Sequence, residues 1–258
     1  MSIVVKGLGF WAPGFADLDA WSGGVADETV TRPPAGLLPP ILRRRTSRLT
    51  RAFVTVYEQA TRCAEDRRNS LPTIFGSAHG EISTLPFLLD QGLSDEGGLS
   101  PIRFSGSVHN AGSGYLSIAT GNTSFTTSIA AGDNTVAAAF QEAEAWLDCE
   151  GSDIVVLIGD DDSPAALCPS RLAFSAFAAA FLLGRAEAGP EAGARPHLGP
   201  VRWNLAAPPA STSLPPDYEN HPCRPALHLL EALLEDSGTV ALGARGGPGV
   251  EVRAGSLS

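Results

Sequence analysis

Apolar residues change their spacing along the chain in a regular alternation. Segments that we expect to be strands cover residues 3–10, 71–75, 124–130 and 153–159. The apolar run at 174–184 fits a strand or a buried helix, and we favour a strand. Segments that we expect to be helices, most of them with one apolar face, cover residues 17–21, 42–66, 82–89, 110–120, 134–149 and 225–236. Strands that alternate with helices predict an α/β fold built in layers.

The last third of the chain carries shorter elements. Residues 186–200 are rich in Ala, Gly, Pro and Glu and are typical of a flexible surface connection. A short strand is expected at residues 201–205, and a closing hairpin at residues 239–243 and 250–253, around a Gly-Gly-Pro-Gly turn. We therefore expect a full N-terminal half over residues 1–185 and a strongly reduced C-terminal part, residues 186–258, that packs on the same core.

The segment at residues 100–145 organises the rest, because it is nearly uncharged yet rich in Gly, Ser, Thr and Asn. It predicts a turn, the helix at 110–120, a Gly121-Asn122 turn, the strand at 124–130 and a Gly132-Asp133 corner that leads into the next helix. A strand that enters a Gly-containing corner before a helix is where α/β enzymes commonly place a nucleophile. This corner contains no Cys, and Ser128 precedes it.

Composition excludes several classes of function. The chain has 258 residues, 43% of them apolar, and a formal net charge of −10. An acidic protein is unsuited to binding nucleic acid or anionic membranes, and general electrostatics oppose docking of an acidic carrier protein. No signal peptide or membrane span is recognisable, so a cytoplasmic location is expected.

The cysteines give no sign of a metal or redox site. Cys63, Cys149, Cys168 and Cys223 are scattered, with no zinc-ligand spacing, and we expect them to serve as small packing residues. Phosphate-binding glycine motifs are absent, so no cofactor is expected.

Charges cluster at two places. Arg43, Arg44, Arg45, Arg48 and Arg51 fall near the start of the helix at 42–66, where cations oppose the helix dipole. This placement suggests carboxylate partners, buried or at an interface, although a solvated basic face explains the pattern equally well. The acidic residues 160–162 follow a buried strand and are expected to form a helix cap and a solvated turn, or to pair with these arginines; a divalent cation is the less favoured interpretation.

Three segments carry a resemblance to a known family: LPPILRRRTSRLTR at 38–51, FGSAHGEI at 75–82 and SPIRFSGSVHNAGSGYLSIATGN at 100–122. The chain resembles the β-ketoacyl synthases, which have the thiolase-like fold, and in particular the chain length factors of type II polyene or aryl polyene synthases. The resemblance covers about the first two thirds of the chain.

The resemblance implies an inactive member that works beside an active one. Ala130 falls where an active ketosynthase has its acyl-accepting Cys, and His197, His221 and His228 lie outside any HGT-type segment. An Ala methyl cannot form a thioester, and without paired imidazoles the charge that develops during decarboxylation is not stabilised. The expected function is therefore a non-catalytic subunit that pairs with an active ketosynthase and shapes its acyl tunnel, meeting the acyl carrier protein only indirectly.

The resemblance also assigns expected roles to side chains. The strand at 124–130 is expected to pair with its twin across a dimer two-fold. Candidates for the tunnel or the interface are Phe104, Tyr115, Ser128, Ala130 and Phe140.

For the polar residues at the helix starts we expect structural roles rather than catalytic ones. Ser107, His109 and Asn110 are expected to cap the helix at 110–120 rather than to form a catalytic base with a Ser. His79 and Glu81 are expected to cap a helix start rather than to act as an acid–base pair.

Two other functions remain open at this stage. One is a stand-alone acyl hydrolase or acyltransferase that uses Ser128 or Cys168, and the other is a purely structural binding module.

Overall fold

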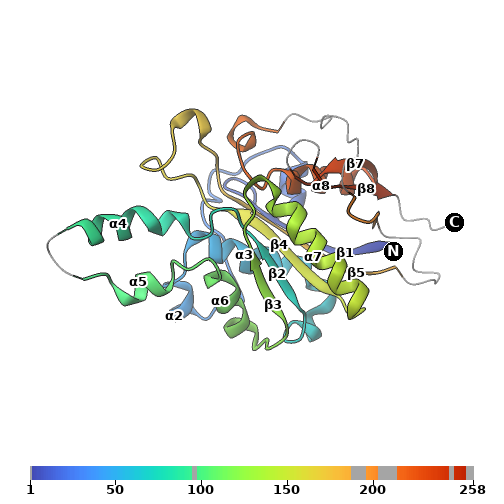
Figure 1. The fold of residues 1–258 in the computed structure, drawn as a ribbon, viewed down its shortest axis with the longest axis horizontal. Helices are drawn as coiled ribbons and strands as arrows, with labels where there is room; N and C mark the ends of the chain where they lie inside the picture. Colours follow the sequence, from blue (N-terminus) through green and yellow to red (C-terminus); the bar gives the residue numbers. More distant parts are fainter. Residues whose placement is uncertain (1, 95–97, 187–195, 203–213, 244–246, 254–258) are drawn as a thin grey trace.

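The computed structural model of the chain describes residues 2–94, 98–186, 196–202, 214–243 and 247–253. Eight strands of these residues form one sheet, in the order β3-β2-β4-β5-β1-β6-β8-β7 (Figure 1). The strands are β1 (Ile3–Trp11), β2 (Thr73–Gly76), β3 (Thr126–Ile129), β4 (Ile154–Asp160), β5 (Phe177–Arg185), β6 (His197–Leu198), β7 (Ser237–Ala241) and β8 (Gly249–Arg253). β2 lies parallel to both β3 and β4, and the remaining pairs are antiparallel.

The α-helices of the described residues are α1 (Leu18–Ser22), α2 (Pro40–Arg43), α3 (Arg48–Ala60), α4 (Leu85–Leu93), α5 (Pro101–Ser105), α6 (Ala111–Thr120), α7 (Thr135–Cys149) and α8 (Pro225–Leu234). Short 3-10 helices are η1 (Arg62–Arg67), η2 (Ile82–Thr84), η3 (Gly132–Asn134), η4 (Ser170–Leu172) and η6 (Pro216–Tyr218). No helix in the described part of the chain is long and apolar enough to cross a membrane.

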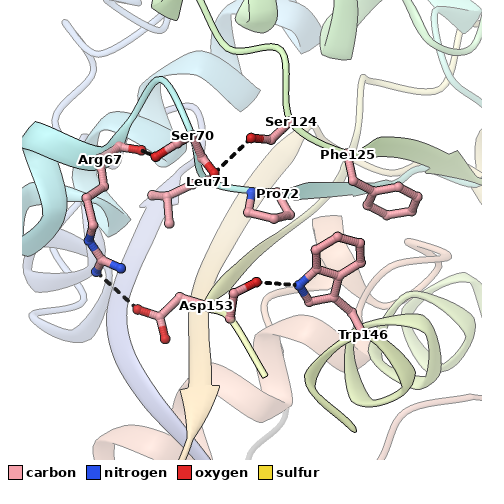
Figure 2. A pocket seen from close by; sticks show the side chains of 9 residues that line it. Arg67, Ser70, Leu71, Pro72, Ser124, Phe125, Trp146 and Asp153 are labelled. Carbon is pink, nitrogen blue, oxygen red and sulfur yellow. Dashed lines mark hydrogen bonds and ion pairs between the residues drawn. The ribbon is translucent and has the colours of Figure 1, made fainter. Parts of the chain in front are cut away.

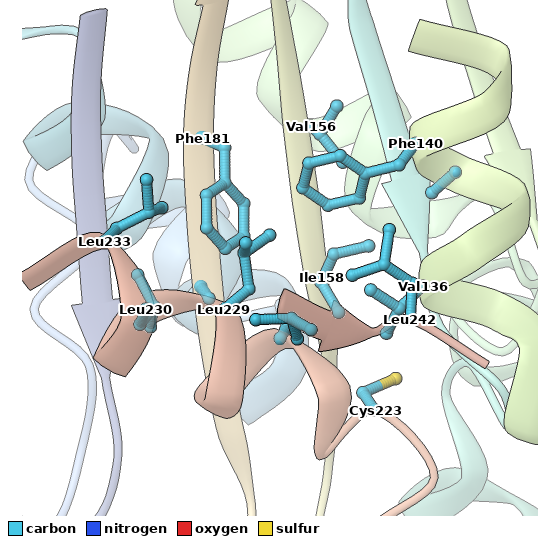
Figure 3. Packing of buried hydrophobic residues seen from close by; sticks show 14 of the residues in the cluster. Val136, Phe140, Val156, Ile158, Phe181, Cys223, Leu229, Leu230, Leu233 and Leu242 are labelled. Atoms are coloured by element: carbon cyan, nitrogen blue, oxygen red, sulfur yellow. The ribbon is translucent and has the colours of Figure 1, made fainter. Parts of the chain in front are cut away.

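Helices cover both faces of the sheet, because side chains of the central strands alternate between two cores. Val156 and Ile158 of β4 pack with α7 and α8 on one face, where Phe140 meets Phe181 edge-on at a centroid distance of 5.3 Å (Figure 3). Val155 of β4 points to the other face and packs with α3 and α6. The expected layered α/β architecture is confirmed.

Close approach of β1 to α3 depends on glycine. A Cβ added at Gly7 would lie 2.0 Å from the Ala60 carbonyl oxygen, and one added at Gly9 would lie 2.2 Å from that of Val56. Real Cβ atoms do not approach backbone oxygens so closely, so a side chain at either position would push α3 off the sheet.

The prediction of one continuous helix at 42–66 is wrong. It is divided into α2, α3 and η1, with a break at residues 44–47. The break is stabilised locally, because Ser47 adopts an extended conformation and its hydroxyl accepts a hydrogen bond from the Thr50 amide, as an N-cap does. Arg48 therefore begins a new helix instead of continuing an old one.

Two helices project from the sheet as an arm, which we define as the described residues 85–94 and 98–105, with α4 and α5 at its two sides (Figure 1). The sequence predicts only a helix at 82–89 followed by a loop, whereas α4 continues to Leu93 and α5 replaces the expected turn. Neither helix contains a buried residue.

The reduced C-terminal part contributes to the same sheet, since β6, β7 and β8 extend it beyond β1. The division at residue 185 stays a prediction. The loop expected at 186–200 contains the two-residue strand β6, and the strand expected at 201–205 is represented by one bridge between Arg202 and Gly249; residues 203–213 lie outside the described part.

Candidate functional site

Three segments meet at one edge of the sheet, because parallel strands end on the same side. β2 leads into Ser77, β3 into Ala130, and β4 ends at Asp160. The loops beyond the carboxyl ends of parallel strands are the usual place for ligands in α/β proteins. We therefore take this edge as the candidate site.

Asp160 is the centre of a buried hydrogen-bond network. Its carboxylate, fully buried, accepts hydrogen bonds from the Ser77 hydroxyl at 2.5 Å, the Ala78 amide at 3.0 Å and the His79 amide at 2.9 Å. A charged acceptor with several donors is strongly held, and this one fixes the loop that follows β2. The structural role of the contact is to tie the ends of β2 and β4 together.

The segment before α8 completes this network. The Cys223 thiol lies 3.2 Å from the second carboxylate oxygen of Asp160 and donates to it, and the Cys223 amide donates to Nδ1 of His221 at 3.0 Å. Burial, and next the Asp160 charge, raise the pKa of the Cys223 thiol well above its ordinary value. Burial lowers the pKa of His221 to about 3, so the ring is neutral.

This group does not fit a metal ion, although Asp160, His221 and Cys223 have ligand atoms within 4.8 Å of one another. A metal needs a thiolate and a free imidazole lone pair. Here the thiol keeps its proton, and Nδ1 of His221 is occupied by an amide donor, which leaves the ring proton on Nε2. The same reasoning makes Cys223 a poor nucleophile, since the reactive form of Cys is the thiolate.

The neighbouring acidic residues bind an arginine. Arg48 at the start of α3 donates from Nε to Asp161 at 2.7 Å and also pairs with Asp162. Asp160 and Asp161 are buried, so the expected solvated turn is wrong for these two, whereas the expected pairing with an arginine is confirmed for Arg48.

A second carboxylate is buried beside the same helix. Glu81 accepts hydrogen bonds from the Ser47 hydroxyl at 2.9 Å and the Thr50 hydroxyl at 2.8 Å, and its other oxygen is buried without a partner. Burial raises the pKa of Glu81 to about 7 against the lowering effect of these hydrogen bonds.

The corner after β3 is open and lacks reactive groups. Ala130 is exposed, and Gly132 turns the chain with a positive φ of 55°. The Thr135 hydroxyl accepts from the Ala131 amide at 3.0 Å and donates to the Gly132 carbonyl at 2.7 Å, which stabilises the turn. Among the described residues, this corner presents the Ala130 methyl group to solvent.

Comparison with known proteins identifies the family. The family model of the β-ketoacyl synthase N-terminal domain matches residues 19–242. The chain belongs to the β-ketoacyl synthase family. No curated protein matches it significantly.

Solved structures of ketosynthases share the fold at low sequence identity. A chain from the complex of the ketosynthase ApeO with its chain length factor ApeC from Xenorhabdus doucetiae has 18% identity and a TM-score of 0.70, over 98% of this chain and 99% of that one. A chain of the ishigamide ketosynthase/chain length factor has 16% identity and a TM-score of 0.60, over 80% and 68% of the two chains.

A third neighbour extends the comparison to a complex with a carrier protein. A chain of the AntDE:AntF complex, a type II polyketide ketosynthase with its acyl carrier protein, has 18% identity and a TM-score of 0.58, over 80% of this chain and 70% of that one. The expected thiolase-like fold is thus confirmed.

The candidate tunnel residues are not brought together by this ketosynthase-like chain alone. Phe104 lies on the arm and is 56% exposed, whereas Tyr115 of α6 is half-buried against the core beneath α3. Phe140 is fully buried on the opposite face of the sheet, so core packing accounts for it. Ser128 lies in β3, and its hydroxyl is buried without a hydrogen-bond partner.

The expectation that Ser107, His109 and Asn110 cap α6 with their side chains is wrong. Asn110 occupies the N-cap position of α6, but its side chain makes no cap hydrogen bond. The Ser107 hydroxyl donates to the Phe104 carbonyl instead, and Nε2 of His109 lies 2.8 Å from the Ser77 carbonyl oxygen. His109 thereby connects the loop before α6 to the end of β2.

His79 and Glu81 face different partners and do not form a pair. Nδ1 of His79 lies 3.8 Å from Asp160, and its ring stacks on Phe174 at a centroid distance of 5.8 Å, whereas Glu81 faces α3. Of the four cysteines, Cys63 and Cys149 are exposed, so the expected packing role is wrong for them and holds for Cys223.

Sequence reasoning missed Ser77, His221 and Cys223. The available signal was local: Ser77 directly follows a strand, and His221-Pro-Cys223 directly precedes a helix. Nothing in the spacing shows that the two segments meet at Asp160, because the contact depends on the antiparallel strands between them.

A pocket of roughly 380 Å³ lies at the other ends of the same strands, where β2, β3 and β4 begin (Figure 2). Its wall includes Trp146 stacked on Phe125 at a centroid distance of 4.8 Å, and Arg67 paired with Asp153 at 3.0 Å. The Ser124 hydroxyl donates to the Ser70 carbonyl, so these polar groups satisfy one another. Because the polar side chains named here are paired, and the edge at Asp160 brings together more buried polar groups, we take the pocket as the weaker candidate.

Proposed function

We propose that this chain is a non-catalytic ketosynthase-like subunit, a chain length factor. It pairs with an active β-ketoacyl-[acyl carrier protein] synthase and helps to shape the acyl tunnel of that enzyme. The pathway proposed is a type II synthase of the polyene or aryl polyene kind. As a subunit without its own acyl-transfer chemistry it needs no cofactor.

The observation that carries the proposal is the corner after β3. Ala130 stands exposed where the family resemblance places the nucleophile, and a methyl group cannot accept an acyl chain. Cys223, the buried thiol of the Asp160 network, keeps its proton and donates it in a hydrogen bond to the Asp160 carboxylate. Three described histidines of this edge already have partners. His109 contacts the Ser77 carbonyl oxygen, His221 accepts from the Cys223 amide, and His79 stacks on Phe174 with its Nδ1 3.8 Å from Asp160.

Two surfaces support pairing with a larger partner. β3 is the first strand of the sheet and is only four residues long, and its outer edge is unpaired within the described residues. The arm exposes a set of large apolar side chains: Leu85, Phe87, Leu89, Leu93, Leu99, Ile102 and Phe104. Apolar surface of this extent is typical of an obligate interface.

The comparisons favour a ketosynthase as the occupant of these surfaces. The neighbours described above are ketosynthases in complex with a chain length factor or a carrier protein. The matched chain of the ApeO–ApeC complex also has nearly the same extent as this one, because each is covered almost completely. A short ketosynthase-like chain beside a ketosynthase is the arrangement that we propose here.

The direct test is co-expression with a tagged ketosynthase from the same gene neighbourhood. We expect the two chains to co-purify as a stoichiometric complex. A well-behaved monomer that ignores this ketosynthase would overturn the proposal.

The same system separates the other two functions. A stand-alone acyl hydrolase requires an activated Ser128 or Cys168, yet the Ser128 hydroxyl has no partner and the Cys168 thiol lies against the Pro169 carbonyl at 3.6 Å. Labelling by a serine- or thiol-directed acyl probe that either substitution removes would establish that function. A purely structural module would leave product length unchanged when Phe104 or Tyr115 is replaced.

A further inference from the structure

We infer that Glu81 is a positioning residue, which fastens the base of the arm to α3 and so sets the orientation in which the arm is presented. Among the described residues, α4 packs mainly on η2, and neither α4 nor α5 contains a buried residue. The orientation of the arm therefore depends on what holds the chain where it enters and leaves the arm (Figure 1). This orientation is a property of the chain alone, whereas its consequence for pairing rests on the proposed function.

The chain enters the arm through the loop that follows β2. Glu81 directly precedes η2, which continues into α4, and its side chain is only 5% exposed. One carboxyl oxygen accepts hydrogen bonds from the hydroxyls of Ser47 and Thr50, at the N-cap and in the first turn of α3. The backbone carbonyl of Glu81 accepts from the Thr84 hydroxyl at 2.7 Å and from the Thr84 amide at 3.0 Å. One residue thus joins α3 to the start of the arm.

The chain leaves the arm beside the same loop. Nε2 of His109, which follows α5, lies 2.8 Å from the Ser77 carbonyl oxygen. Gly80 packs against this ring, since a Cβ added there would lie 2.8 Å from Cδ2 of His109, and its φ of 59° favours glycine as well. Both ends of the arm therefore converge on residues 77–81, and Glu81 ties this loop to α3.

The protonation state of Glu81 decides how firmly the base is held. The second carboxyl oxygen is buried without a partner among the described residues, so an ionised carboxylate would be incompletely satisfied there. Burial raises the pKa of Glu81 to about 7, against the lowering effect of the Ser47 and Thr50 hydroxyls, and the negative charge of Asp161 adds to the rise. The neutral carboxyl therefore fits the site better than the charged one.

No cation of the surrounding described elements neutralises Glu81. The titratable side chains of these elements are Arg48 and Arg51 on α3, Asp161 and Asp162 after β4, His79 in the loop, and His109 before α6. Arg48 pairs with Asp161 and Asp162, and Arg51 donates to the Arg43 carbonyl. His79 lies near Asp160. An ionised Glu81 reaches water only when the base opens, so opening becomes more favourable as pH rises from 4.5 to about 7.

The test is hydrogen exchange at the base of the arm in the isolated full-length chain. The backbone amides of Ile82, Thr84 and Leu85 report opening, because each donates to a carbonyl of residues 80–82. Exchange is measured at about pH 5.5 and about pH 7.5 and corrected for the intrinsic exchange rates. We expect the opening equilibrium to rise by about twentyfold between these values, as linkage predicts for a carboxyl whose pKa is 4.5 when open and about 7 when closed.

Two variants distinguish fastening by Glu81 from a general effect of pH. Glu81→Gln keeps the acceptor for both hydroxyls and cannot ionise, so its amides should be protected equally at both pH values. The matched control, Glu142→Gln at an exposed position of α7, should follow the wild type. Equal protection of the wild-type chain at both pH values overturns the inference. A Glu81→Gln chain that loses protection as the wild type does, or lacks it at both values, overturns it as well.

The consequence for pairing is measured separately, as binding to immobilised ketosynthase at the lower pH. Glu81→Ala, which releases the base, should bind at least about fivefold more weakly, because the arm must first return to its bound orientation, and Glu81→Gln should bind as the wild type does. Undiminished binding by Glu81→Ala overturns the consequence for pairing. If the wild-type chain forms no complex, the proposed function fails, and hydrogen exchange alone decides whether Glu81 fastens the arm.

Discussion

Polar substitutions on the arm should abolish pairing without affecting the fold. We choose Leu93→Asp together with Ile102→Asp, because these side chains are 85% and 64% exposed and belong to helices that contain no buried residue. Full burial of a Leu or Ile side chain contributes about 1.5–3 kcal/mol. The exposed shares of the two side chains therefore contribute together about 2–4 kcal/mol when a partner covers them.

That free energy corresponds to a dissociation constant weakened by about 30- to 1,000-fold, before the cost of burying the new carboxylates is added. The assay is biolayer interferometry with immobilised ketosynthase. The free energy of unfolding of the isolated chain, measured in urea, should change by no more than about 0.5 kcal/mol, since neither side chain packs against the fold.

The matched control is Val25→Asp with Leu172→Asp, which are 79% and 47% exposed and lie outside the arm. The control should bind as the wild type does. Undiminished binding by the arm variant, or the same loss in the control, would refute the reasoning that the arm is the apolar part of the interface.

Three further predictions concern residues at or near the carboxyl ends of β2, β3 and β4. Asp160→Ala should lower the free energy of unfolding by about 3–5 kcal/mol in urea titrations, because it leaves buried hydrogen-bond donors without an acceptor. The control Asp133→Ala, at an exposed site, should be nearly neutral. The pKa of Glu81 is raised from 4.5 to about 7, so between these values the folded state holds a proton that the unfolded chain releases. Stability should therefore fall as pH rises through this window, by up to about 3 kcal/mol, and Glu81→Gln should remove that fall when the two unfolding curves are compared. Ala130→Cys should give a thiol that iodoacetamide alkylates but no condensation activity, since His109 and His221 are hydrogen-bonded and His79 stacks on Phe174 beside Asp160; turnover by that variant, measured by mass spectrometry of products, would contradict the account.

Periodicity predicted the layers of this fold because the apolar faces are long and regular. The runs that became β4 and β5 and the apolar face of α7 each matched their expected element closely. The division between α2 and α3 was not predictable in the same way, because apolar spacing continues across it and the break depends on the cap at Ser47.

The candidate site was predictable only where it depends on local sequence. The proposal that Ala130 stands at the nucleophile position follows from the corner pattern and the family resemblance together, and it stays a prediction. The network at Asp160 does not, because it joins residues 77–79, 160 and 223, which are separated by several elements. The arm was underestimated for a different reason: neither α4 nor α5 has a buried residue in the described part of the chain, so no long apolar face marks their full extent in the sequence.

The central claim is that this chain contributes shape and binding surface but no acyl chemistry. The most direct measurement loads the reconstituted pair with acyl carrier protein thioester and locates the acyl group on each subunit by mass spectrometry. We predict an acyl adduct on the ketosynthase alone, and loss of condensation when the nucleophilic Cys of that partner is replaced by Ala. An acyl adduct on Cys223, Ser128 or any other residue of this chain, or condensation by this chain alone, would contradict the account.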